Sequence, residues 1–202
     1  MGLTPRQFEQ LQQRVSGSRR APAPVLVAET RGTATVDAVV LGIDPSLRGT
    51  GYGVLRPGRP HPVALTHGTI RCPAGWERTR CLAHISVTLR EVVRTHRPTV
   101  CVVEGLFYAQ NLQTAMLMGE ARGAALAAVA EAGLAVFEIA PRKVKQAIVG
   151  YGGAQKLAVA RMVQRLLQLP EPPPPDAADA LALALAHAQA LGRYTLSAPK
   201  RL

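Results

Sequence analysis

The sequence predicts an α/β fold, in which a mixed sheet of five strands is flanked by helices on both faces. Three apolar, strand-like segments precede the first long segment with helical periodicity, so the first three strands should be antiparallel neighbours. Strands and helices alternate from there on, which is typical of strands that are added in parallel. The sheet should therefore combine both kinds of strand pairing.

The first two strands are predicted to form a hairpin within the segment VLGIDPSLRGTGYGVL, residues 40–55. The run Val39–Ile43 is apolar and indicates a buried strand. Asp44 follows it directly, and a proline and a turn rich in Gly and Thr lead into the second apolar strand. A carboxylate is thus expected at the tip of a core strand.

The later elements follow from apolar periodicity and from the prolines and glycines that end them. Further strands are predicted at residues 62–72, 99–103 and 134–139. Helices are predicted at residues 76–96, 111–132, 141–148, 155–169 and 176–191. Pro98 ends the first of these helices, Gly133 ends the second, and a stiff PEPPPP linker precedes the last.

Composition divides the chain into three parts. Residues 1–36 are predicted to be an N-terminal extension, with a short helix that starts at the capping box Thr4–Gln7 and a flexible linker behind it. Residues 37–192 should form the folded domain. Residues 193–202 form a basic tail, which we expect to be frayed.

The overall composition narrows the classes of partner. A net charge of +11 favours an anionic partner, of which nucleic acid is the commonest, although general solubility explains the charge equally well. No run of about 18 apolar residues is free of charges, so no membrane span is expected. The three cysteines are an odd number without CxxC spacing, which suggests neither a disulfide framework nor a zinc site. We therefore expect a reduced, cytoplasmic protein.

Four carboxylates lie at strand ends or on one helix face, where they can act together as metal ligands. Asp44 ends the first strand and Glu104 ends the fourth, while Asp176 and Asp179 are spaced to share one face of the last helix. Carboxylates brought together repel one another unless cations lie between them, and Mg²⁺ prefers such oxygen ligands. Two ions about 3.5–4 Å apart can hold the attacking and leaving oxygens of a phosphodiester.

Each carboxylate alone has a structural explanation. Asp176 and Asp179 resemble ordinary helix capping, Glu104 resembles a surface residue at a strand end, and Asp44 can begin an Asx-turn. Only their combination favours a metal site.

Four segments, taken together and in this order, resemble the RuvC family of Holliday-junction resolvases: LGIDPSLRGTGYGV, VVEGLFYAQN, APRKVKQAIVGYGGAQK and PDAADALALALAH. The resemblance covers about residues 38–190. It implies the RNase H-like fold and a homodimer that nicks four-way DNA junctions symmetrically in recombination and repair. It also implies two Mg²⁺ ions per active site, for which Mn²⁺ can substitute, and junction-binding and branch-migration partners of the RuvA and RuvB type.

The resemblance also assigns roles to residues. Asp44 would bridge both ions, Glu104 and Asp179 would each hold one side, and Asp176 would complete the second site, although some family members carry His at that position. Two lysines, Lys145 and Lys156, would lie near the scissile phosphate, and Phe107 would act as a wedge at the junction. Apart from the resemblance, Arg142 and Lys143 are predicted either to contact the phosphate backbone or to be plain surface charge.

Structural explanations remain for several of these residues. The lysines can belong to a solvated helix face, and Phe107 can fold into the core. Gly119 and Gly123 lie four residues apart in one helix and suggest close approach of another backbone, either the sheet or a dimer partner.

Three other functions are compatible with parts of this pattern. An actin-like ATPase needs a second Asp-x-Gly phosphate loop and two such domains, and neither fits this chain. A non-catalytic junction-binding protein would not need all four carboxylates. A RuvC-like nuclease that trims structured RNA shares the fold, but DAADALA and Phe107 fit the resolvase better.

Overall fold

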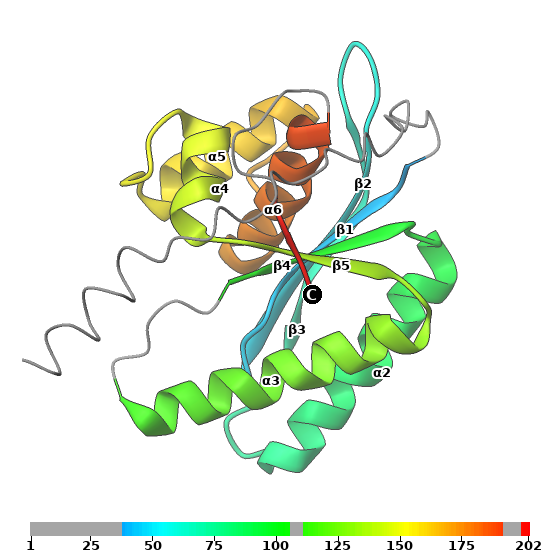
Figure 1. Ribbon diagram of the computed structural model, residues 1–202. Helices are drawn as coiled ribbons and strands as arrows, with labels where there is room; N and C mark the ends of the chain where they lie inside the picture. Colours follow the sequence, from blue (N-terminus) through cyan, green and yellow to red (C-terminus); the bar gives the residue numbers. More distant parts are fainter. Residues whose placement is uncertain (1–37, 106–110, 192–198) are drawn as a thin grey trace, which may run out of the picture. The chain divides into compact units, whose positions relative to one another are not determined.

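The computed structural model describes residues 38–105, 111–191 and 199–202. These residues form an α/β fold around a mixed sheet of six strands, in the order β3-β2-β1-β4-β5-β6 (Figure 1). The strands are β1 (Val40–Asp44), β2 (Gly49–Arg56), β3 (Val63–Arg71), β4 (Val100–Glu104), β5 (Ala135–Ile139) and β6 (Lys200–Arg201). The helices are α2 (Arg78–His96), α3 (Leu112–Glu131), α4 (Pro141–Val149), α5 (Lys156–Leu167) and α6 (Pro175–Leu191).

The strand pairing confirms the predicted mixed sheet. Strands β1, β2 and β3 pair antiparallel, whereas β4 pairs parallel with both β1 and β5. Within the described residues, the boundaries of the predicted elements agree with the structure to within about two residues, whereas the helix predicted to start at Thr4 lies outside them. The proposed start of the folded domain stays a prediction, because residues 1–37 lie outside the described part.

The predicted number of five strands is wrong, and so is the expectation of a frayed tail for residues 200–202. Lys200 and Arg201 form β6, which pairs antiparallel with Glu138 and Phe137 of β5. The amide of Leu202 also donates to the Val136 carbonyl at 3.0 Å. The edge of β5 offers unpaired backbone groups that a short extended segment can satisfy, and so brief a pairing leaves no periodic pattern in the sequence.

Helices cover both faces of the sheet (Figure 1), and an apolar cluster lies between the sheet and the helices on each face. Leu41, Ile43 and Val103 pack toward α2 and α3, while Val40 and Val102 pack toward α4, α5 and α6. Because side chains alternate along a strand, Asp44 and Glu104 share the face of Val40 and Val102. Both carboxylates are therefore directed toward the face that carries α6.

Helix α6 lies unusually close to the first hairpin. A Cβ atom added at Gly42 would stand 1.9 Å from the Ala180 carbonyl oxygen, and one added at Gly51 would stand 2.0 Å from that of Asp176. Only glycine allows this approach of backbone to backbone. The glycines of the first motif thus bring the start of α6 onto the ends of β1 and β2.

The glycines of α3 do not serve the sheet. Nothing lies within 4 Å of a Cβ atom added at Gly119 or Gly123, within the described residues. This excludes the sheet as the backbone they would approach and leaves the dimer partner as the remaining hypothesis. Separately, no helix in the described ranges is long and apolar enough to span a membrane.

Candidate active site

Two neighbouring parallel strands place Asp44 and Glu104 side by side. Strands β1 and β4 run in register, with Ile43 opposite Val103, so the next residue of each strand lies at the same edge of the sheet. Both residues are half-buried. Parallel strands with buried faces give these two carboxylates a rigid support.

Helix α6 supplies the next two carboxylates. Its first turn holds Asp176 against β2, where the Asp176 carbonyl would meet a side chain at Gly51. Asp179 follows nearly one turn later, and its charge raises the pKa of both Asp44 and Glu104. The helix therefore presents Asp179 to the two strand ends.

Burial and mutual repulsion control the protonation of this group. Burial, followed by the charges of Glu104 and Asp179, raises the pKa of Asp44 to about 8. Burial is also the main reason that the pKa of Glu104 is raised, with Asp179 second. A hydrogen bond between the two carboxyl groups favours a proton on Asp44. At neutral pH the pair shares a proton in place of a second negative charge.

Two lysines oppose this negative charge. Lys156 Nζ lies 2.9 Å from Asp179 Oδ2, and this hydrogen bond is the largest cause of the raised pKa of Lys156. Lys156 lowers the pKa of Asp44 and Glu104, and Lys145 lowers that of Glu104. Asp176 lies within electrostatic reach of Lys156, whose pKa it also raises.

The side chains fit a hard divalent cation by their chemistry. In the part of the chain that the structure describes, no three His, Cys, Asp or Glu side chains are already arranged as metal ligands. However, Asp44, Glu104 and Asp179 are oxygen donors whose repulsion is relieved by a shared proton and by the charges of Lys156 and Lys145. A cation of charge +2 would remove the need for both.

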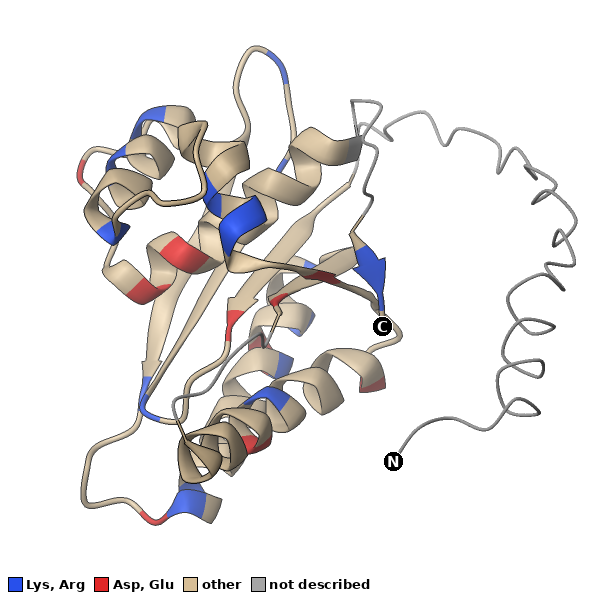
Figure 2. Ribbon diagram, turned by 60° about the vertical axis from the view of Figure 1, so that its left-hand side comes forward, with Lys and Arg blue, Asp and Glu red and all other residues tan. Residues whose placement is uncertain are grey.

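The other sequence candidates lie outside this cluster. Arg142 and Lys143 are exposed on α4. Phe107 lies outside the described residues. Helices α4 and α5 carry basic residues and no acidic ones, and Figure 2 shows blue segments among the tan of this region. The site is thus flanked on one side by a basic surface.

The sequence did not indicate a basic groove next to Asp176. Arg48, Gly49, Thr69, Arg71 and Asp176 line it, together with Cys72 and Pro73. Arg48 also holds the segment after β3, because its Nη1 donates to the carbonyl oxygen of Pro73 at 2.7 Å and to that of Trp76 at 3.1 Å. An isolated arginine in a turn carries no pattern that would have revealed this position.

Comparison with known proteins identifies the family. The family model of crossover junction endodeoxyribonuclease RuvC matches residues 40–187. The crossover junction endodeoxyribonuclease RuvC of Heliobacterium modesticaldum is 46% identical over 133 residues, which are 66% of this chain and 82% of the relative. That of Halorhodospira halophila is 48% identical over 130 residues, 64% of this chain and 77% of the relative.

Solved structures agree. Thermus thermophilus RuvC in complex with a Holliday junction substrate is 36% identical, with a TM-score of 0.73 over 82% of this chain and 99% of that one. The yeast mitochondrial Holliday junction resolvase Ydc2 has a TM-score of 0.56 over 91% of this chain and 87% of that one, at 12% identity, and so supports the fold alone. The chain therefore belongs to the RuvC family of crossover junction endodeoxyribonucleases, hydrolytic and metal-dependent nucleases of the α/β class.

Proposed function

We propose that this chain is a Mg²⁺-dependent endonuclease that resolves four-way DNA junctions by paired, symmetric nicks during recombination and repair. The observation that carries the proposal is the convergence of Asp44, Glu104 and Asp179 at one edge of the sheet. The matched structure of a relative bound to a Holliday junction supports the choice of substrate.

Asp44, Glu104, Asp176 and Asp179 would hold two Mg²⁺ ions, for which Mn²⁺ can substitute. The ions would supply positive charge to the scissile phosphate and lower the pKa of the attacking water. The protein holds its carboxylates on two core strands and one closely packed helix, so the ligands keep their positions before any substrate arrives. Asp176 is at the rim of this arrangement, beside the basic groove.

Lys156 and Lys145 would act on the phosphate. The Lys156 side chain is 68% exposed, although its ammonium group contacts Asp179. It can therefore donate to a non-bridging phosphate oxygen without leaving a buried site. A fixed positive charge there stabilises the negative charge that develops in the transition state.

The basic residues around the site would hold the DNA backbone. Arg71 belongs to β3, in the groove beside Asp176, whereas Arg142 and Lys143 belong to α4, which follows β5. In the order of the sheet, β3 and β5 lie on opposite sides of β1 and β4, the strands of Asp44 and Glu104. Contacts of this kind orient DNA without reading its sequence. Phe107 stays a candidate wedge on sequence grounds, since an aromatic ring can stack on unpaired bases.

A second copy of the chain would cover the exposed face of α3. The exposed positions of this face carry no charge along about five turns: Leu112, Met116, Gly119, Gly123, Ala127 and Ala130. On this uncharged face Leu112 is 76% exposed and Met116 is 55% exposed, so apolar side chains are available to a partner. A two-fold axis at this face would give two sites for two opposed nicks.

Membership of the family supports a proposal for the cellular setting. We propose a cytoplasmic protein that works with junction-binding and branch-migration motor proteins of the RuvA and RuvB type. The three cysteines are free and buried, which agrees with a reducing compartment.

A panel of substrates tests the proposed function. Purified protein with Mg²⁺ is incubated with a mobile four-way junction, a linear duplex of the same sequence and a structured RNA. We expect paired nicks in the junction alone. Equal cleavage of the RNA would favour the RNA-trimming nuclease, and junction binding without cleavage would favour a non-catalytic junction-binding protein.

A further inference from the structure

Arg122 of α3 is a buried arginine on the face of the sheet opposite to the carboxylates. It is 8% exposed and lies beside the alanines that pack α3 against Ile43 and Val103. The charges of Asp44 and Glu104 are directed to the other face, toward α6. A buried charge needs a specific partner, so the contacts of Arg122 indicate its role.

The guanidinium of Arg122 joins two strands from behind. Its Nη1 donates to the backbone carbonyl oxygen of Glu104, and its Nη2 donates to Glu138 Oε2 on β5. The side chains of this ion pair are only 10% and 22% exposed. Arg122 thus binds the main chain of the very residue whose carboxylate faces the site.

The end of β4 has little other support at this point. The register of β1 with β4 ends at Ile43 and Val103, so Glu104 has no ladder partner on the β1 side. On the other side it is paired with Ile139, and the Gly105 amide donates to the Ile139 carbonyl at 3.0 Å. The hydrogen bond from Arg122 satisfies a carbonyl at the position where the sheet ends.

We propose that Arg122, held by Glu138, is a positioning residue for Glu104. It fixes the peptide of Glu104 and so the direction of the carboxylate toward Asp44 and Asp179. It acts on the main chain of Glu104, because its hydrogen bond ends on the backbone carbonyl oxygen of that residue. The inference rests on the proposed metal site.

The choice of variants separates positioning from folding. Removal of Arg122 alone would leave Glu138 as an unpaired, partly buried charge and would destabilise the protein for that reason. The double variant R122M/E138Q removes the ion pair without leaving a charge, and it removes the bond to the Glu104 carbonyl. R122K keeps a charge for Glu138 but lacks the planar fork that serves two acceptors at once.

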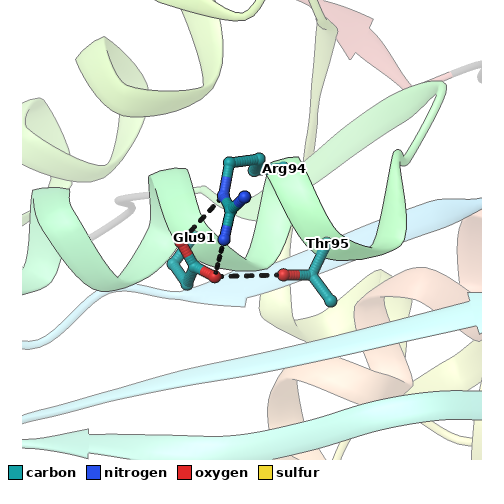
Figure 3. Close-up of polar contacts among 3 residues, drawn as sticks. All are labelled: Glu91, Arg94 and Thr95. Carbon is teal, nitrogen blue, oxygen red and sulfur yellow. Dashed lines mark hydrogen bonds and ion pairs between the residues drawn. The ribbon is translucent and has the colours of Figure 1, made fainter.

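The matched control is a surface ion pair with the same chemistry. Arg94 of α2 donates to Glu91 through two bonds of 3.0 and 2.6 Å, and Thr95 donates to the same carboxylate (Figure 3). Both ionic side chains are more than half exposed, at 77% and 58%. The double variant R94M/E91Q should behave as the wild type in every measurement.

The experiment compares these proteins with the wild type in four measurements: thermal unfolding in EDTA, junction binding in EDTA, Mg²⁺ binding by calorimetry without DNA, and single-turnover cleavage at varied Mg²⁺. For R122M/E138Q and R122K we expect folded proteins with wild-type junction affinity. We expect Mg²⁺ affinity and cleavage rate to fall about 10-fold or more, as for other residues that orient metal ligands.

Two results would overturn the inference, and they differ. If the wild type is active and both variants match it in Mg²⁺ affinity and cleavage rate, Arg122 serves the fold alone. A wild type that neither binds Mg²⁺ nor cleaves would overturn the proposed function, and this inference with it. If the double variant fails to fold, R122K alone decides between these results.

Discussion

Asp44 is in an environment that disfavours its own charge. It is half-buried, faces two other carboxylates, and has a pKa raised to about 8. This environment lowers the free energy of unfolding of the metal-free protein. Functional sites are often built at such an expense of stability. The cost should be visible in the pH dependence of folding.

The first prediction concerns this pH dependence. The folded protein keeps a proton on Asp44 between about pH 4 and 8, whereas the unfolded chain loses it near 3.8. Stability from this group is therefore present at low pH and is lost as the pH rises to about 8. In EDTA at pH 8, D44N should be up to about 5 kcal/mol more stable than the wild type, because each unit of raised pKa corresponds to about 1.4 kcal/mol.

Urea unfolding in EDTA at pH 5 and pH 8 measures this effect. The difference between D44N and the wild type should shrink toward pH 5. A difference that is the same at both pH values, or a less stable D44N at pH 8, would contradict the assigned environment of Asp44.

The second prediction concerns Lys156. Its ion pair with Asp179 is exposed on the lysine side, so K156M should change the free energy of unfolding by less than about 1 kcal/mol. The single-turnover cleavage rate should fall about 100-fold, because a charge near the phosphate is lost. The exposed Arg165 on the same helix provides the control R165M. An equal loss of rate in both variants would argue for general DNA attraction instead.

At the scale of elements, the contact between α6 and the first hairpin decides where the carboxylates meet. The third prediction is that G51A displaces the start of α6, because its Cβ atom would stand 2.0 Å from the Asp176 carbonyl oxygen. Overpacking of this kind costs about 1–3 kcal/mol. The free energy of unfolding and the rate of Mg²⁺-dependent cleavage should both fall in G51A. G75A meets nothing within 4 Å and is the control; wild-type cleavage in G51A would contradict the role of this contact.

The strands and helices were predictable because each has a local signal. Apolar runs, a proline at the start of α4 and glycines at helix ends fix most boundaries, and Gly133 does adopt a positive φ of 74° after α3. Strand β6 was not predictable, since two basic residues gain their structure only from the edge of β5. Local chemistry predicts an element, whereas a pairing at a sheet edge depends on the whole fold.

The residues of the candidate site likewise divide into those with a local sequence signal and those without one. Asp44, Glu104 and Asp179 were found because carboxylates directly at strand ends, or spaced along a helix face, are a visible pattern. Arg122 was not found, because one arginine in an Ala-rich helix does not reveal that it reaches the Glu104 carbonyl across 18 positions of sequence. Support for a site from the opposite face of a sheet has no signature in sequence spacing.

At the scale of the whole molecule, paired nicks require two sites in a fixed relation. The fourth prediction is that M116E, on the uncharged face of α3, weakens the dimer and abolishes the coordination of the two nicks. Sedimentation velocity and the fraction of singly nicked junction measure these effects. Val87 is 61% exposed on α2, so V87E controls for a new surface charge. A dimeric M116E with paired nicks would exclude this face as the interface.

The most direct test of the catalytic metal site is to measure the single-turnover cleavage rate of a four-way junction at varied Mg²⁺ concentration. The junction is labelled on two opposed strands. The test compares the wild type with D44N, E104Q and D179N, and with E171Q as an exposed acidic control. We expect Mg²⁺-dependent paired nicks by the wild type and E171Q, and junction binding without cleavage by D44N, E104Q and D179N. Full cleavage by any of those three would contradict the claim that these carboxylates form the catalytic metal site.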